Sequence, residues 1–160
     1  MKADEVVSLL KKAKVEEALA AIDKVEDGKE MAKKLTEFAA ALNYLKGLPQ
    51  LSEVLLRRSL LLDPDNPYTH YNLGVLFTNL DAPDHAGKNA ELAERAYKKA
   101  LSIKGDFQEA RYNLALLYYF TDRIDDARRE YKTITDALGD DAGYRDLGVM
   151  LLEEDRMAAT

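Results

Sequence analysis

YNLGVLF at residues 71–77 returns as YNLALLY at residues 112–118. The offset between the two copies is 112 − 71 = 41, and their first four positions differ only in Gly74 against Ala115. Apolar residues with i, i+3, i+4 spacing within the second copy predict a helix. A sequence that recurs in this way indicates an internal repeat, so the first question is whether this offset is its period.

Other residues show that the true period is shorter. Tyr97 and Tyr131 occupy the same place on two similar predicted helices, and their offset is 131 − 97 = 34. Ala40 precedes Gly74 by the same offset (74 − 40 = 34). A single seven-residue insertion (41 − 34 = 7) between Gly74 and Ala93 therefore reconciles both spacings.

A two-helix unit with this shorter period is typical of tetratricopeptide (TPR) repeats, and the side chains of this chain resemble that family as well. The first helix of such a unit carries Leu before Gly or Ala, as in Leu73–Gly74, Leu114–Ala115 and Leu147–Gly148. The second helix carries an early small residue, here Ala18, Ser52, Ala93 and Ala127. The resemblance implies an all-α fold, an α-solenoid that forms a right-handed superhelix of antiparallel helix pairs.

We expect one TPR-like domain over residues 1–160. Its predicted parts are a degenerate N-terminal helix pair at 1–32, three fuller repeats at 33–66, 67–107 and 108–140, and a C-terminal capping helix at 141–154. The second repeat contains the insert, DAPDHAGKN at 81–89, which we expect to be a longer surface loop. Gly139 and the segment DPDNP at 63–67 predict helix ends.

The resemblance also implies where a partner binds, because the first helices of this family line a concave groove that takes peptides. Carried over by position, the predicted groove residues are Tyr44, Tyr68, Tyr71, Asn72, Asn79, Tyr112, Asn113, Leu116, Tyr119, Phe120 and Arg145. Tyrosine offers a large contact area and a polar tip, which suits a recognition surface. Each ring has the alternative of packing between neighbouring helices, and Asn72 and Asn113 have the alternative of bonding within their own repeat.

The charge and the absence of cysteine narrow the classes of partner and site. The chain has 23 Lys and Arg residues against 29 Asp and Glu, a net charge of −6, which disfavours binding to nucleic acid or to anionic membranes. The absence of cysteine removes disulfides and thiolate metal ligands, and it fits a cytoplasmic location. No apolar run approaches the ~20 residues that a membrane span requires.

The sequence does not predict an enzyme, a metal site or a cofactor. His70 and His85 are the two histidines, and neither belongs to a metal-binding or catalytic motif. Adjacent acidic pairs such as Asp125–Asp126 point to different helix faces, as on a solvated surface. We expect a non-enzymatic protein–protein interaction module, a scaffold or adaptor that binds a peptide segment or helix of a partner. The alternatives are a self-assembling homo-oligomeric scaffold and a small acidic secretion-type chaperone.

Overall fold

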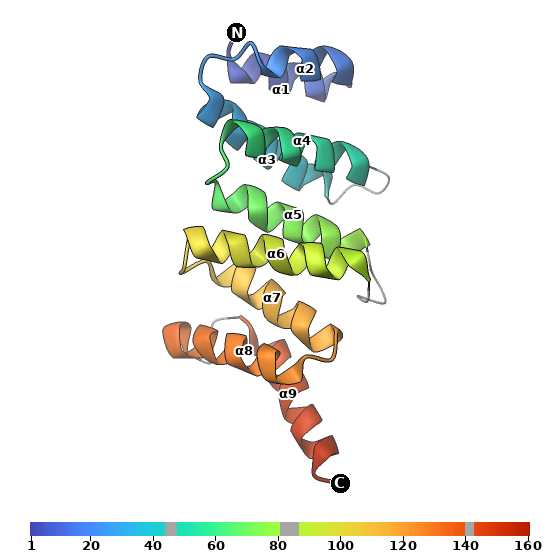
Figure 1. Cartoon of the computed structure of the whole chain (residues 1–160), viewed down its shortest axis with the longest axis vertical. Helices are drawn as coiled ribbons and strands as arrows, with labels where there is room; N and C mark the ends of the chain where they lie inside the picture. Colours follow the sequence, from blue (N-terminus) through green and yellow to red (C-terminus); the bar gives the residue numbers. More distant parts are fainter. Residues whose placement is uncertain (44–47, 81–86, 140–142) are drawn as a thin grey trace. The chain divides into compact units, whose positions relative to one another are not determined.

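The computed structural model describes residues 1–43, 48–80, 87–139 and 143–160, and within these residues all regular structure is α-helical (Figure 1). The helices are α1 (Ala3–Lys11), α2 (Val15–Ile22), α3 (Gly28–Leu42), α4 (Pro49–Leu62), α5 (Pro67–Leu80), α6 (Lys88–Ile103), α7 (Gln108–Phe120), α8 (Ile124–Leu138) and α9 (Arg145–Ala158). They divide into two compact units, Met1–Leu76 and Phe77–Thr160, with the boundary inside α5. Tyr44 and most of the predicted insert lie outside the described residues.

Several helix ends fall where local chemistry predicts them. The segment 63–67 separates α4 from α5, and Pro67 is the first residue of α5. Helix α8 ends at Leu138, before Gly139 with its positive φ of 78°. Helix α3 begins at Gly28, ahead of the predicted repeat boundary at 33, because the Asp27 carboxylate accepts a hydrogen bond from the Glu30 backbone N–H at 3.0 Å. Helix α9 covers Arg145–Ala158 and overlaps the capping helix predicted at 141–154, of which residues 141 and 142 lie outside the described residues.

The first unit is built from neighbouring helices that bury apolar side chains between them. Helices α1 and α2 pack against each other, α1 also packs on α3, and α3 lies beside α4 (Figure 1). Val6, Leu35 and Leu55 are fully buried, so each of α1, α3 and α4 contributes to this core. Ala18 and Ser52, two of the predicted small residues, are also fully buried, which allows close helix approach.

Three buried hydroxyl groups bond to one another inside the first unit. Thr36 on α3 lies 2.9 Å from the Ser59 hydroxyl on α4 and 2.7 Å from the Thr69 hydroxyl on α5. Ser59 and Thr69 are 3.1 Å apart, and Ser59 also donates to the backbone carbonyl of Ala32 at 2.9 Å. The triangle thus satisfies polar groups that would otherwise be costly to bury, and it ties three helices together.

In the second unit, α6 packs on α7, α7 on α8, and α8 on α9 (Figure 1). The large side chains at the centre of this packing are Tyr97, Leu114, Ile134 and Leu147. The small residues between helices are Ala93, Ala115 and Ala127, all fully buried. Gly148 also behaves as the repeat predicts: a Cβ there would lie 2.9 Å from Cζ of Tyr131, so α8 and α9 meet where glycine leaves room.

Candidate peptide-binding surface

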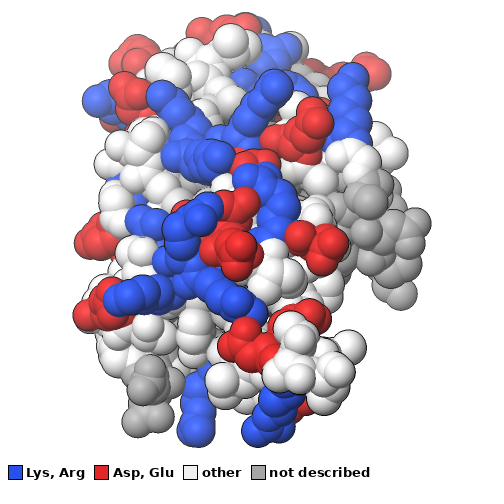
Figure 2. Space-filling view, turned by 60° about the horizontal axis from the view of Figure 1, so that its bottom comes forward, with Lys and Arg blue, Asp and Glu red and all other residues white. Residues whose placement is uncertain are grey.

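Charged side chains of both signs lie on the face that Figure 2 presents. Many of them pair locally along one helix, as Arg57 does with Glu53 at 2.8 Å and Lys132 with Asp136 at 2.8 Å.

Within the described residues, no group of His, Asp or Glu has an arrangement that fits a metal ion. None of the helices in the described ranges combines the length and the apolar character needed to cross a membrane.

Helix α7 has two apolar sides with different exposure. Its core side holds the buried residues Leu114, Leu117 and Tyr118, each less than 5% exposed. Another set of large side chains lies outside that stripe, and we call it the α7 face: Tyr112, Leu116, Tyr119 and Phe120. The first three are half-buried, and Phe120 is 48% exposed. The sequence predicted all four as groove residues, and the structure places them on this one helix.

Two residues of the α7 face contact the α9 region. The ring of Tyr112 lies 4.7 Å from the ring of Tyr144, and the Tyr119 hydroxyl donates to Oε1 of Glu154 at 3.1 Å. Burial and then hydrogen bonding to Glu154 raise the pKa of Tyr119, so the hydroxyl keeps its proton and acts as a donor. The ring of Tyr119 also meets Phe120 edge to face at 5.4 Å. These contacts hold the rings in defined positions while leaving part of each exposed.

Tyr144 and Glu154 were not predicted from the sequence. The repeat-equivalent of Tyr144 on α7 is Arg111 (144 − 33 = 111), so the spacing gave no reason to expect an aromatic side chain there. Glu154 is one of several acidic residues near the end of the chain, and nothing in its pattern marks it as the partner of Tyr119. Only the arrangement of α7 beside α9 identifies these two residues.

The remaining predicted groove residues have varied surroundings. On α5, Tyr68 is 50% exposed and Tyr71 is half-buried. The Asn72 side chain donates to the backbone carbonyl of Tyr68 at 2.8 Å, which is the local bond that the sequence left as an alternative. Asn79 is exposed and Asn113 is half-buried.

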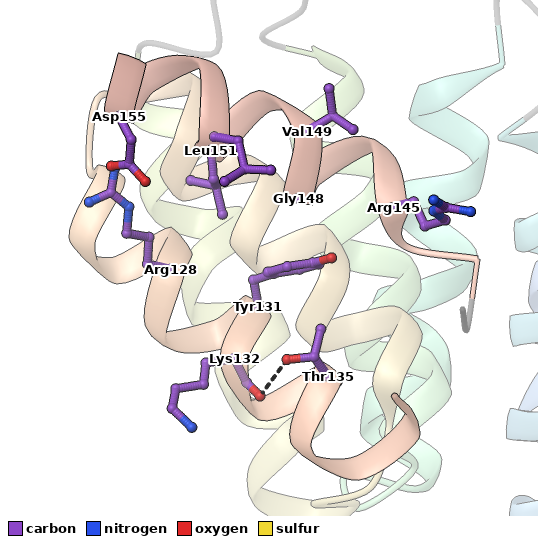
Figure 3. A pocket seen from close by; sticks show the side chains of 10 residues that line it. Arg128, Tyr131, Lys132, Thr135, Arg145, Gly148, Val149, Leu151 and Asp155 are labelled. Carbon is purple, nitrogen blue, oxygen red and sulfur yellow. Dashed lines mark hydrogen bonds and ion pairs between the residues drawn. The ribbon is translucent and has the colours of Figure 1, made fainter. Parts of the chain in front are cut away.

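Arg145 is exposed at the start of α9, where Figure 3 shows it at the edge of a groove between α8 and α9. Arg128 and Lys132 of α8 line the same groove. The predicted basic residue therefore shares its surroundings with two further cationic side chains.

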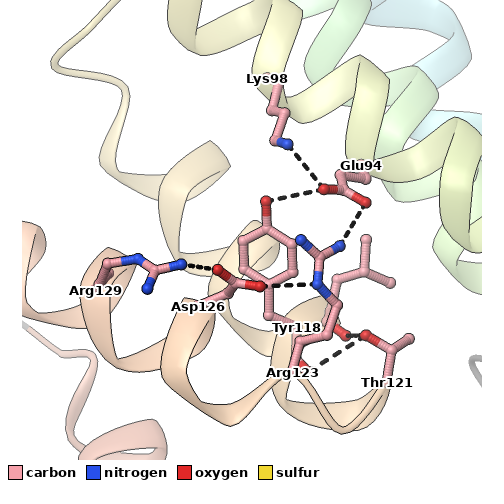
Figure 4. Close-up of polar contacts among 8 residues, drawn as sticks. Glu94, Lys98, Tyr118, Thr121, Arg123, Asp126 and Arg129 are labelled. Carbon is pink, nitrogen blue, oxygen red and sulfur yellow. Dashed lines mark hydrogen bonds and ion pairs between the residues drawn. The ribbon is translucent and has the colours of Figure 1, made fainter.

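A polar network lies next to the α7 face and joins α6 to the turn between α7 and α8 (Figure 4). Oε1 of Glu94 accepts hydrogen bonds from the Tyr118 hydroxyl at 3.0 Å and from Lys98 at 2.9 Å, and Oε2 accepts one from Arg123 at 2.9 Å. Arg123 also donates to Asp126 at 2.8 Å and lies 4.3 Å from the Tyr118 ring centroid. Burial acts to raise the pKa of Glu94, but the three hydrogen bonds outweigh it and hold the pKa below its ordinary value.

This network forms one wall of a cavity of about 480 Å³ between the start of α6 and the turn after α7. Phe120 lines the same cavity and thus lies between it and the rest of the α7 face. The turn includes Asp122, whose φ of 60° is in the left-handed region. The second unit therefore presents partly exposed aromatic rings beside a recess whose wall carries paired charges.

Comparison with known proteins agrees with this fold. Residues 85–148 match the family model of the tetratricopeptide repeat. None of the curated proteins matches the chain. The crystal structure of a thermophilic TPR protein from Thermus thermophilus is similar, with a TM-score of 0.60, 23% sequence identity, and coverage of 92% of this chain and 76% of that one. Proteins of this family are generally non-enzymatic scaffolds with protein partners. The chain is thus an all-α helical-repeat solenoid, and its residues 85–148 match the tetratricopeptide repeat.

Proposed function

We propose that this protein binds a peptide segment or helix of a partner protein, and that the α7 face makes the main apolar contacts. The TPR fold indicates a protein–protein interaction module. The peptide mode is supported by the chemistry of the α7 face, where aromatic rings with few rotatable bonds are already fixed by neighbours. A partner that covers these rings gains apolar contact without having to order them first.

The exposure of Phe120 carries this proposal. The core stripe of α7 is complete without it, because Leu114, Leu117 and Tyr118 already fill the space against the neighbouring helices. Phe120 is nevertheless 48% exposed, with its ring against Tyr119 and beside the cavity. Covering the exposed half of this ring with an apolar group of a partner stabilises a complex by about 1 kcal/mol or more.

Polar residues near these rings would fix the orientation of the bound segment. We propose that Asn113 and Arg145 in the second unit hold backbone or carboxylate groups of the bound segment, as amide and guanidinium groups do. On α5, Tyr71 and Asn72 are the repeat-equivalents of Tyr112 and Asn113, Tyr68 lies about one turn before them, and Asn79 lies near the end of the helix. We propose the same role for them at that helix.

The test begins with peptides selected from a display library against the folded chain, followed by measurement of their Kd by fluorescence anisotropy. Phe120→Ala is the diagnostic variant. Leu138→Ala is its matched control, because Leu138 is 47% exposed at the end of α8 and lies outside the α7 face. We expect Phe120→Ala to weaken binding by about tenfold or more, and Leu138→Ala to leave the Kd unchanged.

Amide chemical shifts measured with and without the selected peptide locate the binding surface. Changes concentrated on 112–120 and 144–149 are the expected result. Peptides that bind both variants equally and shift resonances only on α6 or α8 would show that recognition uses another surface.

A further inference from the structure

The outer side of α9 leaves an apolar groove uncovered at the C-terminal end of the second unit (Figure 3). The groove lies between α8 and α9 and has a volume of about 490 Å³. Tyr131, Gly148 and Leu151 are among the residues that line it, and Val149 and Leu152 of α9 stand at its edge with 57% and 60% of their surfaces exposed. The predicted capping role of α9 is therefore incomplete, because a cap has a polar outer face.

The repeat itself indicates what fits this groove. Val149 and Leu152 follow Leu116 and Tyr119 at one common offset (149 − 116 = 33; 152 − 119 = 33), so they are the α9 equivalents of the α7 face. On α7, that side already has a helix next to it, since Tyr119 donates to Glu154 of α9. The equivalent side of α9 is built in the same way and has no described helix of this chain beside it. A helix is thus the form of ligand that the groove fits.

The rim of the groove selects the charge of that helix. Arg128 and Lys132 of α8 and Arg145 of α9 all line it. Arg128 is paired with Asp155 of α9, and Lys132 is paired with Asp136 at 2.8 Å. The Lys132 side chain is 74% exposed, and so exposed an ion pair is weak enough for Lys132 to exchange its partner for an incoming carboxylate. A helix that enters here with carboxylates beside its apolar residues meets favourable charges, whereas a basic helix is repelled.

Helix α9 itself carries carboxylates beside apolar residues on its outer side. Asp146 and Glu153 flank Val149 and Leu152, and both are exposed residues; Glu153 also forms an exposed ion pair with Arg156 at 2.7 Å. We propose that a second copy of this chain occupies the groove, so that two copies pair through α9 and each brings its acidic flank to the basic rim of the other. A two-fold pair uses one surface on both partners, and this surface carries the apolar patch together with both signs of charge that self-pairing requires.

Analytical ultracentrifugation over a range of protein concentrations tests the pairing. We expect the wild type to shift from monomer to dimer as concentration rises, and Leu152→Glu to raise the dimer dissociation constant by at least tenfold. Leu61→Glu is the control, because Leu61 is 81% exposed on α4 and lies far along the chain from the groove. A wild type that stays monomeric at every concentration, or a dimer that Leu152→Glu does not weaken, would overturn the proposal.

A charge-exchange experiment separates pairing through this groove from general loss of folding. Lys132→Glu and Glu153→Lys each place like charges across the contact, so each variant alone is expected to dimerise poorly. When the two variants are mixed, opposite charges face each other again and a heterodimer is expected to form. A mixture that remains monomeric would contradict the charge pairing. Circular dichroism of each variant confirms its helical content, and Phe120→Ala is expected to leave the dimer intact.

Discussion

Gly148 shows how one missing side chain sets the distance between two helices. A Cβ at this position would collide with the end of Tyr131 on α8, at 2.9 Å from its Cζ. The repeat pattern had already marked the position as small, so the identity of the residue was predictable. The neighbour that requires it was not, because Tyr131 appears in the sequence only as a repeat-equivalent of Tyr97.

We predict that Gly148→Ala destabilises the second unit even though alanine favours helix. The steric cost of moving Tyr131 is roughly 1–3 kcal/mol, against a gain of about 1 kcal/mol in helix propensity. In a Tyr131→Ala background the collision disappears, so the same substitution should then stabilise the protein. Urea unfolding of the wild type, the two single variants and the double variant, measured at low concentration, checks this change of sign. A loss of stability from Gly148→Ala in both backgrounds would show that Tyr131 is not the obstacle.

The ionised carboxylate of Glu94 makes the stability of the second unit depend on pH. Its folded-state pKa is lowered, so its contribution to stability is present above the unfolded pKa, near 4.5, and is lost as pH falls through the folded value. We predict that the stability difference between wild type and Glu94→Gln shrinks as the pH is lowered from 7 to about 3. Thermal unfolding at a series of pH values measures it. Glu91→Gln, an exposed change on the same helix, is the control. A difference that is constant with pH would contradict the role of the ionised carboxylate.

At the level of elements, the hydroxyl triangle of Thr36, Ser59 and Thr69 joins α3, α4 and α5. We predict that Thr69→Val costs about 1–3 kcal/mol, because it leaves buried hydroxyls with too few partners. The triple variant Thr36→Val, Ser59→Ala, Thr69→Val removes every member, and we expect it to cost less than the sum of the three single changes. Urea unfolding of the four variants and the wild type decides the point. Strictly additive losses would mean that the hydroxyls act independently.

The N-terminus of α3 depends on one capping side chain. We predict that Asp27→Ala lowers the free energy of unfolding by about 1 kcal/mol, because it removes the acceptor for the Glu30 backbone N–H. Glu26→Ala changes an adjacent exposed acid and is the control. Equal effects of the two substitutions would attribute the loss to charge and not to the cap.

Helix positions were predictable where a residue with a restricted backbone marks the end. Pro67 and Gly139 located the start of α5 and the end of α8. Helix α3 begins at Gly28 and not at the repeat boundary predicted at 33, because the repeat period gives positions within a unit and not the capping chemistry at its edge. The network around Glu94 could not be predicted from the sequence either. Tyr118 was assigned to the apolar stripe, and the hydrogen bond from its hydroxyl to Glu94 on α6 depends on how the helices pack.

For the whole molecule, the helix lengths predict an uneven distribution of stability. Helices α1 and α2 have 9 and 8 residues, which is about two turns each, whereas α3 and α4 have 15 and 14. Short helices gain little from cooperativity and rely on packing at one side. We predict that hydrogen exchange is faster in α1 and α2 than in α3 and α4. Uniform protection of the four helices would show instead that they open as one cooperative block.

The all-α repeat fold could be read from the spacing of a few small and aromatic residues, since helix packing imposes the same requirements on every repeat. The four residues of the α7 face were among the predicted groove residues, but their exposure and their contacts were not predicted. Phe120 was identified as a groove residue, yet its exposure and its place beside a cavity depend on how the turn at 121–123 folds. The uncovered groove beside α9 depends on side-chain exposure that periodicity does not give.

The hydroxyl triangle has a consequence for covalent modification. Thr36, Ser59 and Thr69 are at most 3% exposed, so a kinase cannot reach their oxygens in the folded chain. A phosphate group adds close to two negative charges, and three closely packed helices have no room or counter-charge for it. Phosphorylation at any of the three sites would therefore record that the chain was modified before it folded, and it would also keep that part of the chain from folding.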